Sequence, residues 1–292
     1  MTWKRVATAL VLIPVVVGLV LFASTLVVAV ATAVITVLAL WEYFALGEAI
    51  GHRAYRVWTI VCALMLICAQ WMALNAPKIL ISGEPKNTLL VGMRGEFWFL
   101  LVTGFLFVYV LGLAVLTLWT RRPLVESLPA AGISSSGLLL VAFPLSFAVT
   151  IHGVPEQGPR LLLFALVITW AGDTTAYFVG RAIGKHPLAP QISPKKSWEG
   201  SVGSMVGSLL VAWAFSYWIR IPVGHLVAMA VIGNVAGQMG DLLESAYKRS
   251  AGVKDSGGLL PGHGGVLDRI DALILCIPVI WYYLVLVNPA VN

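Results

Sequence analysis

One stretch of the sequence brings together basic side chains, carboxylates and glycines in an order suited to binding polyphosphate. It begins at Ser245, ends at Asp271 and reads Ser-Ala-Tyr-Lys-Arg, four residues, Lys-Asp, a glycine-bearing spacer and His-Gly-Gly-Val-Leu-Asp-Arg-Ile-Asp. Glycines leave the backbone free to wrap closely around phosphate groups. The cations that could neutralise such a ligand are Lys248, Arg249, Lys254 and Arg269. We therefore predict that this stretch binds phosphates.

Two carboxylates at the end of the stretch have the spacing of metal ligands. Asp268 and Asp271 stand three residues apart at the start of a predicted helix, so both can face the same ion. Hard oxygen ligands beside phosphates favour Mg²⁺. Zinc is not expected, because no Cys or second His is suitably placed.

A polar stripe runs along the predicted helix that precedes this stretch. Its members recur at helical spacing and are Asn234, Gln238, Asp241 and Ser245. One interpretation is that the stripe only holds helices together, with Gly233 and Gly237 letting another backbone come close. Asp241, at the end of the stripe, is harder to explain in that way. We expect it to be a ligand.

An upstream segment, Ser193–Gly200, supplies further cations. Ser193 could cap a helix whose first residue is Pro194. The free N–H groups of that first turn, together with Lys195 and Lys196, would then form an anion site. The alternative is that both lysines are solvated at the membrane surface.

Asp173 places a carboxylate inside an apolar run. A charge there costs about 2.5–3.5 kcal/mol at mid-membrane on insertion scales, so it normally has a functional reason. We expect it to face a polar cavity. The alternative is an aspartate close enough to the helix end to reach water.

The elements that must position these residues are membrane-spanning helices. Of the 292 residues, 59% are hydrophobic and 11% are charged, against about a quarter charged in soluble domains. A crossing helix needs about 20 apolar residues. Nine runs approach that length: about 6–23, 25–46, 57–76, 97–119, 132–151, 161–179, 203–219, 226–243 and 270–287. The predicted fold is an all-α polytopic membrane protein with about nine transmembrane helices.

The basic residues indicate the orientation of these helices. With a cytoplasmic N-terminus, the outer loops hold only Lys78, Lys86, Arg94, Arg160 and Arg220. The remaining 14 of the 19 lysines and arginines are on the inner side, as the positive-inside rule requires. This placement explains the net charge of +6 without nucleic-acid binding, and we expect no nucleic-acid partner.

Polar residues are distributed unequally along the chain. We predict a single integral-membrane domain over residues 1–292, with mainly hydrophobic scaffold helices in 1–155 and a catalytic half in 156–292. Two cytoplasmic motif loops, 181–202 and 244–269, belong to the catalytic half.

The segment Ser245–Asp271 resembles the signature of the phosphatidate cytidylyltransferases, also called CDP-diacylglycerol synthases. Every spacing of that signature is intact, and Tyr247 is a mild departure at a position usually aliphatic or Phe. Ser193–Gly200 and the run Asp173-x-x-Ala176-Tyr177 also resemble the family. The resemblance covers residues 160–288 closely, whereas the N-terminal spans agree only in being hydrophobic.

The resemblance implies a CTP-dependent nucleotidyltransferase of phospholipid biosynthesis. Such an enzyme takes CTP and phosphatidic acid, releases pyrophosphate and CDP-diacylglycerol, and uses a divalent cation. We expect Mg²⁺, alone or with a second cation, on Asp241, Asp268 and Asp271. The predicted catalytic residues are Asp241, Asp268, Asp271, Lys248, Lys254 and His263. The predicted substrate-binding residues are Ser193, Lys195, Lys196, Ser197, Lys248, Arg249, Lys254, Asp255, Arg269 and Asp173.

Several roles and alternatives stay open at this point. His263 could donate to a phosphate, act as a base or hold the loop together. A cytidylyltransferase or kinase acting on a different lipid is the first alternative. An ion-coupled transporter using Asp173 and Asp241 is the second. We expect a homodimer in the bacterial cytoplasmic (inner) membrane, with the active site facing the cytoplasm.

Overall fold

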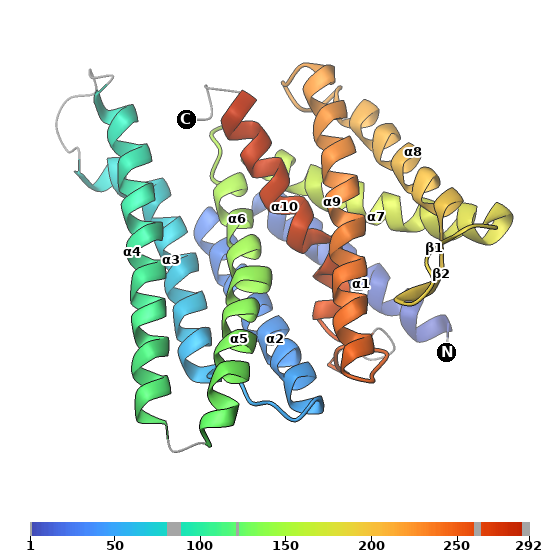
Figure 1. Ribbon diagram of the computed structural model, residues 1–292. Helices are drawn as coiled ribbons and strands as arrows, with labels where there is room; N and C mark the ends of the chain where they lie inside the picture. The colour runs from blue at the N-terminus through green and yellow to red at the C-terminus, as the bar shows by residue number, and fades with distance from the viewer. Residues whose placement is uncertain (1, 81–88, 121–122, 260–263, 288–292) are drawn as a thin grey trace.

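The structure, a computed structural model, describes residues 2–80, 89–120, 123–259 and 264–287. These residues are almost entirely helical, which confirms the predicted all-α polytopic class (Figure 1). The N-terminal half consists of α1 (Thr2–Phe22), α2 (Thr25–Ala49), α3 (Arg56–Leu80), α4 (Leu89–Trp119), α5 (Ser127–Gly137) and α6 (Phe143–His152). A 3₁₀ turn, Leu124–Glu126, precedes α5, and a π-helical turn, Leu138–Ala142, joins α5 to α6.

The C-terminal half contains longer helices and one small hairpin. Its elements are α7 (Gly158–Ile183), β1 (Pro187–Ala189), β2 (Ser193–Ser197), α8 (Trp198–Phe215), α9 (Val223–Ser250) and α10 (Leu267–Val287). In Figure 1, the hairpin lies at the edge of the molecule, where α7 ends and α8 begins.

Seven helical segments within the described residues are long and apolar enough to cross a membrane. They are Thr25–Ala49, Arg56–Asn75, Leu100–Trp119, Leu124–His152, Gly158–Ile183, Val223–Ser250 and Leu267–Val287. The other two predicted spans correspond to α1, where Leu10–Phe22 forms a shorter apolar helix, and to α8, which is not among the seven.

The segment around Pro194 differs from its prediction. Ser193 does not cap a helix starting at Pro194, because Ser193–Ser197 is an extended strand that pairs antiparallel with Pro187–Ala189. The helix starts four residues later, and Ser197 caps it by accepting a hydrogen bond from the N–H of Gly200 at 3.1 Å. Lys195 and Lys196 therefore project from a strand, and the predicted anion site on a first helical turn at Pro194 is wrong.

Helix α9 is longer than the predicted span 226–243. It continues to Ser250, so Ser245, Lys248 and Arg249 belong to its last turns and not to a loop. Polar residues can extend a helix past the apolar run when they find partners, and both Ser245 and Lys248 are buried here. The loop between α9 and α10 accordingly begins after Ser250.

The backbones of α9 and α10 come very close together at Gly240. A Cβ atom at that position would lie 2.4 Å from the backbone oxygen of Asp271. Only glycine allows such an approach, which brings the acidic residues near 241 and 271 to the same place.

We predict that Gly240→Ala destabilises the protein by about 1–3 kcal/mol, because overpacking forces the two helices apart. For a chain of this size this corresponds to a fall of a few degrees in Tm. Thermal unfolding in detergent measures the change. Gly224→Ala, in the same helix with no atom within 4 Å of the added Cβ, is the control and should leave Tm unchanged. Equal Tm values for the two variants would contradict the close contact.

Candidate active site

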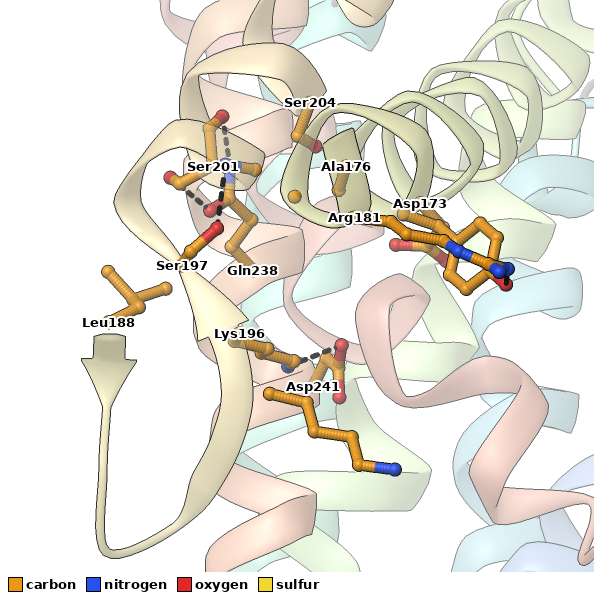
Figure 2. Close-up of a pocket in the computed structure, with 14 residues that line it drawn as sticks. Asp173, Ala176, Arg181, Leu188, Lys196, Ser197, Ser201, Ser204, Gln238 and Asp241 are labelled. Atoms are coloured by element: carbon orange, nitrogen blue, oxygen red, sulfur yellow. Dashed lines mark hydrogen bonds and ion pairs between the residues drawn. The ribbon is translucent and has the colours of Figure 1, made fainter. Parts of the chain in front are cut away.

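A cavity of about 490 Å³ lies between α7, the hairpin, α8 and α9 (Figure 2). Its volume is within the range of about 300–1,000 Å³ that is usual for small-molecule sites. The lining residues are Asp173, Ala176, Tyr177, Gly180, Arg181, Leu188, Lys195, Lys196, Ser197, Gly200, Ser201, Ser204, Gln238 and Asp241. Five of the predicted site residues are thus brought together: Asp173, Lys195, Lys196, Ser197 and Asp241.

An ion pair crosses this cavity. The Nζ atom of Lys196, on β2, lies 2.5 Å from Oδ2 of Asp241, on α9, and each side chain is 28% exposed (Figure 2). Both groups are therefore accessible to a ligand, and each holds the other in place. A triphosphate entering the cavity would compete with Asp241 for the lysine.

The hairpin that carries Lys196 is tied to the start of α8. Oε1 of Glu199 lies 2.6 Å from Nδ1 of His186, and Oε2 accepts hydrogen bonds from the backbone N–H groups of Lys185 and His186. Hydrogen bonds from its own backbone N–H and from His186 lower the pKa of Glu199 to about 2. The carboxylate stays ionised at neutral pH, and the hairpin is fixed beside the cavity.

The polar stripe of α9 faces α8. Nδ2 of Asn234 donates to the hydroxyls of Ser204 and Ser208, each at 2.8 Å. Nε2 of Gln238 donates to Oδ1 of Asn234 at 2.7 Å, and the Ser201 hydroxyl donates to Gln238 at 2.5 Å. Asn234 therefore joins the two helices, as the first interpretation supposed. Gln238 lies at the cavity wall and Asp241 points into the cavity (Figure 2).

Three carboxylates from three helices approach one another here. Asp173 is exposed near the middle of α7, not at its end, and it interacts electrostatically with Asp241, Lys196 and Arg269. The carboxylate of Asp271, on α10, interacts with the charges of Asp241 and Asp173. Like charges brought together in this way need compensation, and Lys196 supplies part of it through its ion pair with Asp241.

A second group of charges lies two turns further along α9. The ammonium of Lys248 is buried and pairs with Glu244 and with Oδ1 of Asp268, the latter at 2.6 Å. Oδ2 of Asp268 accepts hydrogen bonds from the N–H and hydroxyl of Ser256, each at 3.0 Å, and from the N–H of Gly265 at 2.8 Å. Asp268 thus joins α9, the loop and the start of α10.

Glu42 is a residue that the sequence analysis did not place in the site. It is 3% exposed in α2, and its carboxylate accepts hydrogen bonds from the N–H groups of Val266 and Leu267 at 3.0 and 2.8 Å. The Ser256 hydroxyl lies 3.2 Å from the same carboxylate. Glu42 therefore holds the loop and caps α10 from the other half of the chain. An ionisable residue inside an apolar run was the signal that could have identified it.

Other predicted residues lie outside the cavity lining. Ser193 is in β2, paired with Ala189. Nη1 of Arg249 donates to the carbonyl oxygen of Val253 at 2.9 Å. Lys254, Asp255 and Arg269 are exposed. His263 lies outside the described residues.

The predicted metal ligands are distributed over both groups of charges. Within the described ranges, no three Asp, Glu, His or Cys side chains are arranged to hold an ion on their own. Mg²⁺ in phosphate sites, however, is usually held by one or two carboxylates together with substrate phosphates. Asp241, which interacts electrostatically with Asp173 and Asp271, could act together with ligand phosphates in that way. To bind the ion, Asp268 would have to give up its contact with Lys248.

We predict that Glu42→Ala loosens the loop between α9 and α10, because it leaves the backbone N–H groups of Val266 and Leu267 without their acceptor. Each unsatisfied buried group costs about 1–3 kcal/mol. Hydrogen–deuterium exchange of residues 253–267 should become faster. Glu42→Gln, which keeps one acceptor oxygen, should fall between Glu42→Ala and the parent protein. Glu156→Gln, an exposed site on another loop, is the control; unchanged exchange in Glu42→Ala would contradict the role of Glu42.

The sequence of this chain is similar to those of several known proteins. The chain is 36% identical to a phosphatidate cytidylyltransferase of Bacillus subtilis over 178 residues, which cover 59% of this chain and 66% of that protein. It is 39% identical to one of Haemophilus influenzae over 172 residues, covering 56% and 59% of the two chains. A Staphylococcus aureus relative with the same name is 44% identical over 127 residues, covering 43% and 49%.

These alignments span about half to two thirds of the length of the curated relatives. A wider match extends over nearly the whole chain, because residues 3–287 fit the model of the cytidylyltransferase family. With seven candidate membrane spans among its described residues, the chain is an integral membrane protein, and it belongs to the cytidylyltransferase family.

Proposed function

We propose that this protein is a phosphatidate cytidylyltransferase. It would transfer the cytidylyl group of CTP to phosphatidic acid, giving CDP-diacylglycerol and pyrophosphate. The observation that carries the proposal is the Lys196–Asp241 pair inside a cavity of about 490 Å³. The names of the relatives and the signature in Ser245–Asp271 support the same reaction.

The reaction needs no protein nucleophile. A phosphatidate oxygen is already an anion; it attacks the α-phosphorus of CTP, and the bond to the bridging oxygen of the β-phosphate breaks. The protein must bring two anions together, align them and stabilise charge on the departing pyrophosphate. The cations that line the cavity meet these needs.

The lysines of the hairpin are placed to receive the nucleotide phosphates. Lys195 and Lys196 line the cavity, and Lys196 would exchange the carboxylate of Asp241 for a phosphate oxygen. Arg181 lines the opposite wall, where its Nη1 donates to the hydroxyl of Tyr177 at 3.0 Å (Figure 2). It adds a third cation, which the sequence analysis did not include.

The second group of charges would bind the phosphates of the same substrates from the loop between α9 and α10. Lys248 is held by Asp268 and Glu244 and would stabilise charge from its fixed position. Arg249, Lys254, Asp255 and Arg269 would contact phosphate or order one another at the mouth of the site, together with Ser193 and His263. These roles are inferred from the resemblance of the two segments, Ser193–Gly200 and Ser245–Asp271, to the family.

We propose Mg²⁺ as the cofactor, held by Asp241 and Asp271 with CTP phosphates and, after release of Lys248, by Asp268. The ion would neutralise charge on the phosphates as pyrophosphate departs. Asp173 would keep the neighbouring surface negative and orient Lys196 or Arg269.

The lipid would reach the cavity from the bilayer. Tyr177 lines the cavity, and Phe178 and Trp198 follow lining residues in the sequence. All three are exposed and offer apolar contacts for acyl chains. The distribution of basic residues supports a cytoplasmic N-terminus and a site on the cytoplasmic face of the inner membrane. The homodimer expected from the sequence stays a prediction, which light scattering in detergent can check.

Purified protein with Mg²⁺ should convert radiolabelled CTP and phosphatidate to CDP-diacylglycerol, and EDTA should stop the conversion. Asp241→Asn and Asp268→Asn should each lower kcat/KM by about 100-fold or more, as for loss of a preorganised electrostatic contact. Glu156→Gln is the control for expression and handling. Labelled phosphatidate made from diacylglycerol and CTP labelled on its γ-phosphate, with no CDP-diacylglycerol made from phosphatidate and CTP labelled on its α-phosphate, would replace the proposal with a lipid kinase.

Lys196→Ala should raise KM for CTP about tenfold or more, because a hydrogen bond to a charged group contributes about 1.5–3 kcal/mol. Lys185→Ala removes a lysine from the same segment that does not line the cavity, and its KM should be that of the parent protein. Initial rates at varied CTP, with phosphatidate saturating, give both values. Equal KM values in the two variants would remove Lys196 from the nucleotide site.

A further inference from the structure

A second cavity, of about 450 Å³, opens at the end of the bundle where α2 ends, α3 begins and α4 ends. This is the same end of the molecule at which α9 terminates, at the bottom of Figure 1. Among the described residues, the two cavities have no lining residue in common. Nothing in the proposed reaction uses this second space.

Basic side chains form the polar side of the cavity. Nη2 of Arg56 lies 2.7 Å from Oε2 of Glu48, and its guanidinium stands 5.1 Å from the ring centroid of Trp41. The Nε atom of Arg56 is buried and has no hydrogen-bond partner. Arg53, exposed at the rim, adds a second positive charge. The lining side chains, two arginines and one glutamate, therefore carry a net positive charge suited to an anion.

The polar side is fixed before any ligand arrives. The N–H of Tyr55 donates to the hydroxyl of Ser134 at 2.8 Å, which anchors the segment between α2 and α3 to α5. Nε1 of Trp58 donates to the carbonyl oxygen of Tyr109 at 3.2 Å. A Cβ at Gly112 would lie 2.0 Å from the Trp58 indole, so only glycine lets that ring lie against α4. A site held in this way loses little conformational freedom on binding.

The other side of the cavity is apolar and exposed, and it lies on helices that are long and apolar enough to cross a membrane. Val57 and Val61, one turn apart on α3, are 78% and 42% exposed. Leu116, on α4, is half-buried and completes the groove. Arginines at the end of a groove between crossing helices, with apolar walls below, match a ligand that has an anionic head and a hydrocarbon chain.

We propose that this cavity binds an anionic phospholipid. The headgroup phosphate contacts Arg53 and Arg56, and one acyl chain lies along Val57, Val61 and Leu116. A free phosphate would leave the apolar groove uncovered, and a zwitterionic lipid would bring a second cation towards the arginines. The bound lipid is separate from the lipid substrate, because its site is made by α2, α3 and α4.

Native mass spectrometry of the full chain in detergent, titrated with dioleoyl phosphatidylglycerol, tests the proposal. The parent protein should retain one such lipid at concentrations at which dioleoyl phosphatidylcholine is lost. The double variant Arg53→Gln/Arg56→Gln should raise the apparent Kd of that first lipid about tenfold, through loss of charged hydrogen bonds. Leu116→Trp, which fills the groove, should do the same without touching a charge.

Two controls separate this site from annular lipid and from the first cavity. Leu118→Trp alters the same helix at an exposed position outside the cavity and should bind as the parent does. Lys195→Ala/Lys196→Ala should also keep the lipid. Unchanged affinity in both Arg53→Gln/Arg56→Gln and Leu116→Trp, or loss of the lipid only in Lys195→Ala/Lys196→Ala, would overturn the proposal. The readout is independent of catalysis, so failure of the cytidylyltransfer assay would leave it standing.

Discussion

The carboxylate of Asp268 is the constraint on which the site geometry depends. Burying an ammonium such as that of Lys248 is costly unless it is paired, and removal of one partner leaves an uncompensated charge. Asp268 and Glu244 supply that pairing, while the second oxygen of Asp268 gathers three donors from the loop. The end of α9, the loop and the start of α10 are consequently fixed relative to one another by a single side chain.

Glu42 extends this constraint to the other half of the chain. Its partner Ser256 is 214 residues away in sequence, and the same carboxylate caps α10. The N-terminal helices therefore contribute directly to the site. Helix α2 carries Glu42, which accepts hydrogen bonds from the loop between α9 and α10. The two halves differ in sequence composition, but hydrogen bonds between Glu42 and the segment before α10 connect them in the structure.

Most of the helices could be predicted because apolar length is a strong local signal, and the stripe on α9 could be predicted because its spacing fixes one face. The strand at Ser193–Ser197 could not be predicted, because Ser-Pro followed by charged residues is also typical of the start of a helix. Only pairing with Pro187–Ala189 decides the matter, and that contact is tertiary. Likewise, no spacing in the sequence connects Lys196 with Asp241 or Glu42 with Val266.

The pairing of Lys196 with Asp241 has a consequence for how the protein responds to ionic strength. Under the proposed function, each phosphate contact made by that lysine would replace its contact with Asp241, so binding would exchange one ion pair for another. Added salt weakens both sides of this exchange. Under the proposed function, the nucleotide affinity should therefore depend less steeply on salt than the number of nearby cations suggests.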